Sequence, residues 1–310
     1  MVANHNRYSG VELSKSAPDT SMAHDAVSRW LSSFHATPSE LWNHVRNLVS
    51  PTTGYLVCDD TLLDKRYSRA NELAKVQYSG DAHGLVNGIS IVNLLWTDGE
   101  QMIPVDYRIY RKEHDDRTKN DHFLDMLNKA VKRGFSPRYV LMDSWYSSIT
   151  NLKHIRSKGW KFICNLKPNR IVSRNRIPCA LSDLALANTQ VSKVWLKGFG
   201  DILVCKVVAK DGDVTYLATN DLALTGYEDY TGHFQQRWDV EEFHRGIKQT
   251  TGIEHCYSTL ADSQKTHIFA SFVAFVRLET VRLKKHVSWY EQKAEIARFS
   301  TINYLKYANA

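Results

Sequence analysis

Residues 55–61 have the sequence Tyr-Leu-Val-Cys-Asp-Asp-Thr, an apolar run that ends in two adjacent carboxylates. Residues 139–146 show a similar pattern, Tyr-Val-Leu-Met-Asp-Ser-Trp-Tyr, with one carboxylate directly after the run. Short apolar runs of this kind predict buried strands. A carboxylate at the end of a buried strand is costly unless a cation or hydrogen bonds stabilise it. Asp59 and Asp143 are therefore the first candidates for functional residues.

A third carboxylate, Glu241, lies in the segment 234–248, Phe-Gln-Gln-Arg-Trp-Asp-Val-Glu-Glu-Phe-His-Arg-Gly-Ile-Lys, which has helical periodicity. At about 100° per residue, Phe234, Arg237, Glu241 and Lys248 fall on one narrow stripe of a continuous helix. A surface ladder of salt bridges would also place two cations and a carboxylate on one face. Because two strand-borne aspartates accompany the stripe, we favour a functional site.

The segments around these residues predict a mixed α/β fold. The expected strands cover 55–60, 85–96, 102–110, 138–142 and 160–166, and the expected helices cover 118–134 and 148–159. Asp98-Gly99 is a strong hairpin signal between the second and third strands. The resulting order, β-β-β-α-β-α-β, places an antiparallel trio before parallel crossover strands. This is the strand order of the ribonuclease-H-like fold, a mixed sheet flanked by helices.

Two further regions complete the predicted organisation. Residues 1–50 form a short N-terminal helical region, in which the helix at 20–35 is either a DNA-recognition helix or an ordinary amphipathic helix. The break at Pro51–Gly54 predicts a boundary, after which 51–310 form the catalytic domain. A small antiparallel β subdomain interrupts this domain at 167–222. The remaining helices are expected at 226–249, 263–285 and 289–310.

Composition sets weaker limits on function. The chain has 310 residues, 43% hydrophobic and 24% charged, as expected for a globular protein. Its net charge of +7 favours a polyanionic partner only weakly. The five cysteines are scattered without a C-x-x-C, so neither a zinc site nor a disulfide framework is predicted. The polar N-terminus and the lack of a long apolar span predict a cytoplasmic protein without a membrane segment.

Three carboxylates of this kind fit a particular chemistry. Phosphodiester transfer needs two cations roughly 3.5–4 Å apart, one beside the nucleophile and one beside the leaving oxygen. Carboxylate oxygens suit Mg²⁺, and Mn²⁺ as its substitute. We therefore predict that Asp59, Asp143 and Glu241 bind two Mg²⁺ ions. Arg237 and Lys248 are placed to hold the phosphates of the strand that is cut.

The motifs resemble those of a known family. The spacing aromatic-x2-Arg-x3-Glu-x6-Lys resembles the Tyr-Arg-Glu-Lys signature of bacterial insertion-sequence transposases with a DDE triad. The sequences at 59–61 and 143–146 are similar to that family's first and second aspartate motifs, and the β insertion is similar too. Matching Thr61 to the family's Asp-x-Thr selects Asp59 as the first aspartate, with Asp60 as the alternative. Phe234 replaces the signature tyrosine, so a phosphate contact from its hydroxyl is absent.

The resemblance, which covers about residues 50–285, implies a DNA transposase. Such an enzyme cuts the ends of a mobile element and joins the freed 3′-hydroxyl to target DNA. It implies a homodimer that holds two DNA ends together, in a bacterial cytoplasm and on the nucleoid when bound to DNA. A metal-dependent nuclease of the same fold and a catalytically silent DNA-binding descendant are the alternatives. The predicted DNA contacts are Phe234, Arg237, Lys248, Arg170, Arg174 and Trp145.

Some of these residues have a second interpretation. Trp145 either stacks on an unpaired base near the cut or packs in the core. Arg170 and Arg174 lie in a basic loop with Arg176, which we interpret as a DNA-backbone contact rather than an idle surface. Glu241 and His244 have the E-x-x-H spacing of diiron proteins, but the sequence has no second such pair. We therefore interpret His244 as a polar neighbour of the site.

Overall fold

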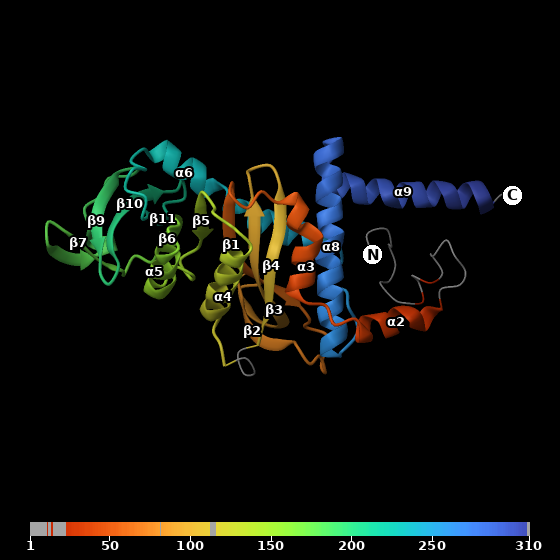
Figure 1. The fold of residues 1–310 in the computed structure, drawn as a ribbon. Helices are drawn as coiled ribbons and strands as arrows, with labels where there is room; N and C mark the ends of the chain where they lie inside the picture. Colours follow the sequence, from red (N-terminus) through yellow and green to blue (C-terminus); the bar gives the residue numbers. More distant parts are fainter. Residues whose placement is uncertain (1–10, 12–13, 15–22, 81, 112–115, 309–310) are drawn as a thin grey trace.

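The computed structural model describes residues 11, 14, 23–80, 82–111 and 116–308. Its centre is an 11-stranded mixed sheet with the strand order β2-β3-β1-β5-β6-β11-β10-β9-β7-β8, and β4 pairs with β3 beside β2. The sheet runs along the length of the molecule, from β7 at one end to β3 and β4 near α8 (Figure 1). No helix among the described residues is long and apolar enough to cross a membrane.

The first half of the sheet contains the strands that the sequence predicts. β1 is antiparallel to β3 and parallel to β5, and β5 is parallel to β6. This is the predicted ribonuclease-H-like arrangement, which the structure confirms. The elements of this half are β1 (Tyr55–Asp64), β2 (Lys75–Ser79), β3 (Gly84–Thr97), β4 (Met102–Tyr110), α4 (Lys119–Lys132), β5 (Tyr139–Met142), α5 (Ile149–Ser157) and β6 (Phe162–Leu166).

Local sequence explains most of these bounds. Residues 55–58 of β1 and all of β5 are buried, which matches their apolar runs. Thr118 begins α4 with a capping box to Asp121, and the Ser148 hydroxyl accepts from a backbone N–H at the start of α5. The short strand β2 is not predicted, because Val76 and Tyr78 are exposed at the edge of the sheet and give no buried face.

The predicted β insertion is antiparallel, but it does not form a separate sheet. β11 pairs with β6 in antiparallel register, with Ala218 opposite Cys164, so the inserted strands extend the central sheet. Without β11, β6 would present an unpaired row of backbone groups at the sheet edge. The elements of the insertion are β7 (Ile171–Arg174), β8 (Ile177–Ala180), η2 (Leu181–Asp183), β9 (Val191–Leu196), β10 (Gly200–Val208) and β11 (Val214–Thr219).

The single helix predicted at 226–249 is wrong. The structure has two helices, α6 (Tyr227–Gln235) and α7 (Trp238–Thr250), separated at Gln236 and Arg237. At this break the backbone bonds join residues three apart, with Arg237 N 2.9 Å from the carbonyl oxygen of Phe234. The turn is therefore tighter than an α-helix, and the angular projection used for the stripe does not hold across it.

Contacts on both sides of the break explain its position. In α6, His233 Nδ1 lies 2.8 Å from the Tyr55 hydroxyl at the start of β1. In the first turn of α7, Asp239 accepts a 2.5 Å hydrogen bond from the Thr97 hydroxyl at the end of β3. Because the two helices are held to different strands, the chain bends between them. These are contacts between distant segments, which the local periodicity does not encode.

The remaining helices lie at one end of the sheet. α8 stands across this end, and α2 and α9 leave it on the side away from the sheet (Figure 1). Thr37 caps the helix that follows it, α3. Residues 1–10, 12–13 and 15–22 of the predicted N-terminal region lie outside the described residues. The bounds are α2 (His24–Ser33), α3 (Pro38–Val45), η1 (Arg46–Leu48), α8 (Ala261–Lys285) and α9 (Trp289–Ala308).

Candidate active site

The register of two parallel strands places Asp59 beside Asp143. Cys58 of β1 and Met142 of β5 are the last pair in the parallel register, and an aspartate follows each of them in the sequence. Side chains at matched positions of neighbouring strands point to the same face of a sheet. The two sequence-predicted aspartates therefore meet on one face, at the end of β5.

The environment of Asp59 disfavours the charged form of its carboxyl group. Burial first, and then the negative charges of Asp143 and Asp60, raise its pKa to about 7. The backbone N–H of Asp60 donates a 2.8 Å hydrogen bond to Asp59 Oδ1, which opposes this rise only in part. A carboxyl with such a pKa favours either a proton or a nearby cation at neutral pH.

Asp143 is held by the loop that follows β5. Its Oδ1 accepts hydrogen bonds from the backbone N–H groups of Trp145, at 2.9 Å, and of Tyr146, at 3.3 Å. Burial nevertheless raises the pKa of Asp143 above its ordinary value, because the two hydrogen bonds offset only part of the desolvation. The carboxylate is therefore fixed in direction and, like Asp59, is stabilised by positive charge nearby.

Asp60 points to the opposite face of β1. Its Oδ1 accepts a 2.8 Å hydrogen bond from the Tyr146 hydroxyl, and its Oδ2 lies 2.6 Å from Lys119 Nζ at the start of α4. Both of its oxygens are thus already paired on the α4 side of the sheet. The structure favours Asp59 over Asp60 as the partner of Asp143, in agreement with the motif match.

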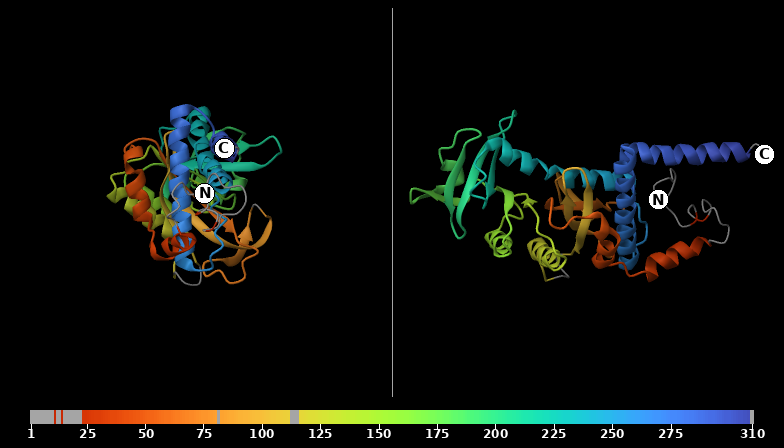
Figure 2. Two further views of the ribbon diagram at one scale, coloured as in Figure 1. Left: turned by 90° about the vertical axis from the view of Figure 1, so that its right-hand side faces the viewer. Right: turned by 45° about the horizontal axis from the view of Figure 1, so that its top comes forward.

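Glu241 reaches the same region from α7, which lies on the other side of the sheet from α4 (Figure 2, right). Arg237 connects it to the strands: Nη2 lies 2.6 Å from Glu241 Oε1, and Nη1 lies 3.9 Å from Asp59 Oδ2. The predicted alternative, an ion pair between Arg237 and Glu241, is therefore present. It is not a surface pair, because the Arg237 side chain is only 12% exposed.

The three carboxylates are suitable ligands for a divalent cation, but in this structure they are not arranged to coordinate one. No group of three or more Asp, Glu, His or Cys side chains within the described part of the chain is close enough together to hold an ion. The Arg237 guanidinium contacts both Asp59 and Glu241 and neutralises part of their charge. Carboxylate oxygens are the ligands that Mg²⁺ and Mn²⁺ prefer, and a cation would relieve the repulsion between the carboxylates. Binding an ion with all three would require Glu241 to exchange its arginine partner for the metal.

The other two residues of the predicted stripe lie apart from the carboxylates. Phe234 packs against the core before the helix break, with the Arg237 guanidinium 5.8 Å from its ring centre. Lys248 is half-buried in the last turn of α7. Burial lowers the pKa of His244 and the Lys248 charge adds to this, whereas the pKa of Asp64 at the end of β1 is lowered mainly by Arg66 and only slightly by Lys248. Of the two cations of the stripe, Arg237 thus contacts the carboxylates and Lys248 lies apart from them at the end of α7.

Trp145 is 57% exposed, so its interpretation as a core residue is wrong. Lys167 Nζ lies 5.5 Å from the centre of its ring, which combines an aromatic face with a cation beside Asp143. Arg170 is half-buried, and its Nη2 donates a 2.6 Å hydrogen bond to the Ser147 carbonyl in the loop after Asp143. Arg170 therefore supports this loop instead of standing free on the surface.

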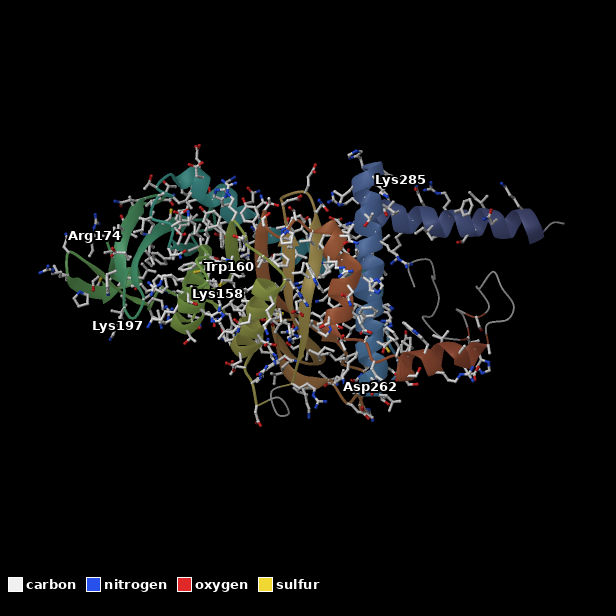
Figure 3. The ribbon with its side chains drawn as sticks, in the orientation of Figure 1. Lys158, Trp160, Arg174, Lys197, Asp262 and Lys285 are labelled. Carbon is white, nitrogen blue, oxygen red and sulfur yellow. The ribbon has the colours of Figure 1, made fainter. Side chains whose placement is uncertain are left out.

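Arg174 lies far from the carboxylates, at the outer end of the sheet (Figure 3). With Arg176, Lys193 and Trp195 it lines a groove of about 570 Å³. The Trp195 side chain is 56% exposed, and Lys193 pairs with Asp201 at 2.7 Å. This groove is basic and aromatic, but it is a separate surface from the one that contains Asp59 and Asp143.

Sequence reasoning missed two residues that shape the site. Tyr146 belongs to the quoted motif, but its hydrogen bond to Asp60 depends on the distance between β1 and β5. Lys119 has no local signal at all, because only the packing of α4 on the sheet brings it to Asp60. Both act on the face opposite to Asp59, where they stabilise the strand that carries it.

The chain also matches a known protein family. Residues 56–277 match the family described as "Transposase DDE domain". The chain belongs to this DDE transposase family. The matched range includes Asp59, Asp143 and Glu241. A search among curated protein sequences found no match for this chain.

One solved transposase structure shows a similar fold. The piggyBac transposase synaptic complex with hairpin DNA, solved by cryo-EM, is 13% identical with a TM-score of 0.51, over 83% of this chain and 54% of that chain. The Drosophila P element transposase strand transfer complex is 10% identical with a TM-score of 0.26, over 87% of this chain and 62% of that chain. The DDE transposase chain thus spans little more than half the length of the piggyBac chain, and the likeness to it concerns the fold alone.

Proposed function

We propose that this chain is a DNA transposase that cuts the ends of a mobile element and joins the 3′-hydroxyl to target DNA. Membership of the DDE transposase family supports this class of reaction. The observation that carries the proposal is the β1–β5 register, which places Asp59 beside Asp143 on the face that α7 covers. Action on two DNA ends implies two copies of the chain, and we propose a homodimer in that complex.

Asp59, Asp143 and Glu241 would hold two Mg²⁺ ions. When bound, the metal supplies a polarised water or hydroxyl as nucleophile and neutralises charge on the leaving oxygen. The protein itself positions the carboxylates. The loop N–H groups fix the direction of the Asp143 carboxylate, and β1 fixes Asp59 next to it. Mn²⁺ is expected to substitute for Mg²⁺, because both accept carboxylate oxygens.

Arg237 has two roles in this proposal. Without metal it neutralises Glu241 and Asp59. When these carboxylates bind cations instead, the guanidinium would be free to hold a DNA phosphate with two parallel hydrogen bonds. Phe234 limits the positions of the guanidinium, because its ring lies 5.8 Å away. Lys248 would contact a phosphate further along the strand, in the direction of Asp64.

Three other residues are proposed to contact DNA. Trp145, with Lys167 over its ring, offers a stacking surface for an unpaired base beside Asp143. Arg170 would contact DNA near the same loop through a guanidinium nitrogen other than the Nη2 that bonds to Ser147. Arg174, at the outer end of the sheet, would contact the DNA backbone away from the cut.

The proposal is tested by the variants Asp143→Asn and Glu241→Gln, assayed on duplexes that carry the ends flanking the gene. Each amide preserves the shape of the side chain and removes the charge that holds metal. We expect cleavage to fall by ~10³-fold or more, with DNA binding nearly unchanged. Asp211→Asn, an exposed aspartate in the turn between β10 and β11, is the matched control and should cut normally.

The products separate the alternatives. Joined products indicate a transposase, whereas cut products alone indicate a nuclease of the same fold. DNA binding without any cleavage by the wild-type chain in Mg²⁺ or Mn²⁺ would favour a silent DNA-binding descendant. Calcium is expected to support binding without turnover, because it accepts irregular coordination. Cleavage that persists after complete chelation, or in Asp143→Asn, would contradict the proposed site.

A further inference from the structure

Of the three proposed metal ligands, Glu241 alone is not attached to the sheet by its own backbone. Asp59 lies on β1 and Asp143 directly follows β5, so the β1–β5 register sets their separation. Glu241 lies in the first turn of α7, just after the break from α6. Its distance from the aspartates therefore depends on how α7 is held against β1 and β3.

A buried polar pair makes this connection one helical turn from Glu241. His244 Nε2 lies 2.9 Å from Asn93 Nδ2 on β3. Asn93 is the residue directly opposite Asp59 in the antiparallel register of β1 and β3. The pair thus joins the neighbour of Asp59 to the helix that carries Glu241, on the same face of the sheet. Asn93 is 1% exposed and His244 is 8% exposed.

The apolar contacts of α7 do not provide the same constraint. Val240, Phe243 and Ile247 are buried beneath the helix, and such contacts hold a helix against a sheet while permitting small rotations and shifts. A hydrogen bond is directional and weakens steeply with angle. Burying an amide and an imidazole is also more costly than burying two apolar groups. The pair is therefore better explained by positioning than by stability.

We propose that Asn93 and His244 form a positioning pair, which sets the distance between Glu241 and Asp59 and thereby the affinity of the site for divalent ions. Neither residue touches metal or DNA in this proposal. The inference rests on the proposed function, because it assumes that Asp59 and Glu241 share a metal site. It goes beyond that function by assigning a role to His244, whose E-x-x-H spacing then serves position and not ligation.

The test is a Mn²⁺ titration of the full chain, with free ion measured by electron paramagnetic resonance. For Asn93→Leu and for His244→Phe we expect a rise of about 10-fold or more in the Mn²⁺ dissociation constant, as for other residues that orient ligands. Circular dichroism and thermal unfolding establish that each variant is folded. His244→Gln retains a polar group near Asn93 and should restore most of the affinity.

The chain supplies a matched control in a second histidine–asparagine pair. His154 Nε2 lies 3.0 Å from Asn128 Oδ1, where α5 packs on α4 and away from Glu241. His154→Phe and Asn128→Leu each remove a hydrogen bond between the same two residue types, here with the imidazole as donor. Because this pair lies away from the site, they should leave the Mn²⁺ affinity within about 2-fold of wild type. Equal losses in both pairs would indicate a general effect on stability and would overturn the proposal.

The outcomes distinguish this proposal from the proposed function. Wild-type Mn²⁺ affinity in folded Asn93→Leu and His244→Phe overturns the positioning role and leaves the transposase proposal intact. A wild-type chain that binds no Mn²⁺ overturns both. If the larger substitutions unfold the protein, Asn93→Ser shortens the side chain and should still weaken Mn²⁺ binding by several fold. Failure of every variant to fold would show a purely structural pair and would also overturn the proposal.

Discussion

Asp59 and Asp143 are placed by the backbone of the sheet, whereas Glu241 is placed by side chains. Strand register fixes the position of the two aspartates relative to each other, whatever apolar residues surround them. Glu241 depends on Arg237, on the Asn93–His244 pair and on the anchoring of α7 at Thr97. Side-chain contacts are easier to change by mutation or by a ligand than a register is. The α7 half of the site is thus the adjustable half.

The largest expected effect separates the two adjacent aspartates of β1. Asp59→Asn should abolish cleavage, by ~10³-fold or more, because it removes a proposed metal ligand. Asp60→Asn should retain activity within about 10-fold but lower the free energy of unfolding by about 1 kcal/mol, since it leaves Lys119 without its anionic partner. Cleavage assays and urea unfolding measure the two quantities. The opposite result would assign the catalytic role to Asp60.

The same comparison predicts a dependence of stability on pH. The folded-state pKa of Asp59, about 7, lies above the ordinary value of 3.8, so the folded protein binds more protons than the unfolded chain between these values. Without divalent ions, the free energy of unfolding should therefore fall as pH rises from about 4 to 7, by roughly 1–4 kcal/mol. Asp59→Asn should remove the part of this slope that Asp59 contributes, while Asp143, whose pKa is also raised, retains its own part. A slope unchanged by that substitution would contradict the described environment of Asp59.

Variants of Arg237 and Lys248 test the half of the site that α7 carries. Arg237→Ala leaves Glu241 and Asp59 without their shared cation, so it should lower stability by about 1 kcal/mol without metal and much less with Mg²⁺. Lys248→Ala should show no such metal dependence. Both should lower the salt dependence of end binding by about one unit, because each removes one phosphate contact. Thermal unfolding with and without Mg²⁺, together with a salt titration, checks both statements.

A smaller effect is expected at Trp145. Trp145→Ala should weaken binding to pre-cut ends that carry an unpaired base by about 1–3 kcal/mol, because it removes a stacking surface. Its effect on unfolding should stay within about 0.5 kcal/mol, since the side chain is largely exposed. Fluorescence anisotropy on duplexes with and without the unpaired base measures the difference. Equal losses on both duplexes would indicate contact with the backbone and not with a base.

The smallest effect is expected at the outer end of the sheet. Arg174→Ala should reduce DNA affinity by only a few fold, with a fall of about one in the salt slope and no change in cleavage of bound ends. Its distance from Asp143 means that it can affect capture of DNA without affecting chemistry. Salt titrations with long and short duplexes provide the measurement, because a short duplex does not reach this end.

Sequence alone predicted the parts of the molecule that depend on local pattern. β4 has the predicted bounds, because it combines an apolar pattern with a clear turn before it. The pairing of Asp59 with Asp143 also follows from the strands themselves. The break at Gln236 and Arg237 was not predicted, because contacts of His233 and Asp239 with distant strands cause it. For the same reason, the sequence placed Phe234 on one continuous helix with Glu241, whereas the structure has the break between them.

Exposure was the second property that pattern could not supply. Trp145 follows a buried strand and precedes a buried tyrosine, so either orientation was consistent with the sequence. The structure turns its ring outward beside Lys167. Arg170 shows the reverse case, since a loop arginine is half-buried against the Ser147 carbonyl. Both outcomes depend on how the loop after β5 packs against the insertion.

The adjacent, oppositely directed aspartates of β1 have a consequence for how this gene tolerates change. Residues 56–58 are buried apolar positions, where exchanges among similar side chains alter packing only slightly. Loss or gain of a single codon there would instead rotate every following side chain to the other face of the strand. The segment should therefore accept many point substitutions in a mutational scan and almost no change in length, because its length determines which aspartate meets Asp143.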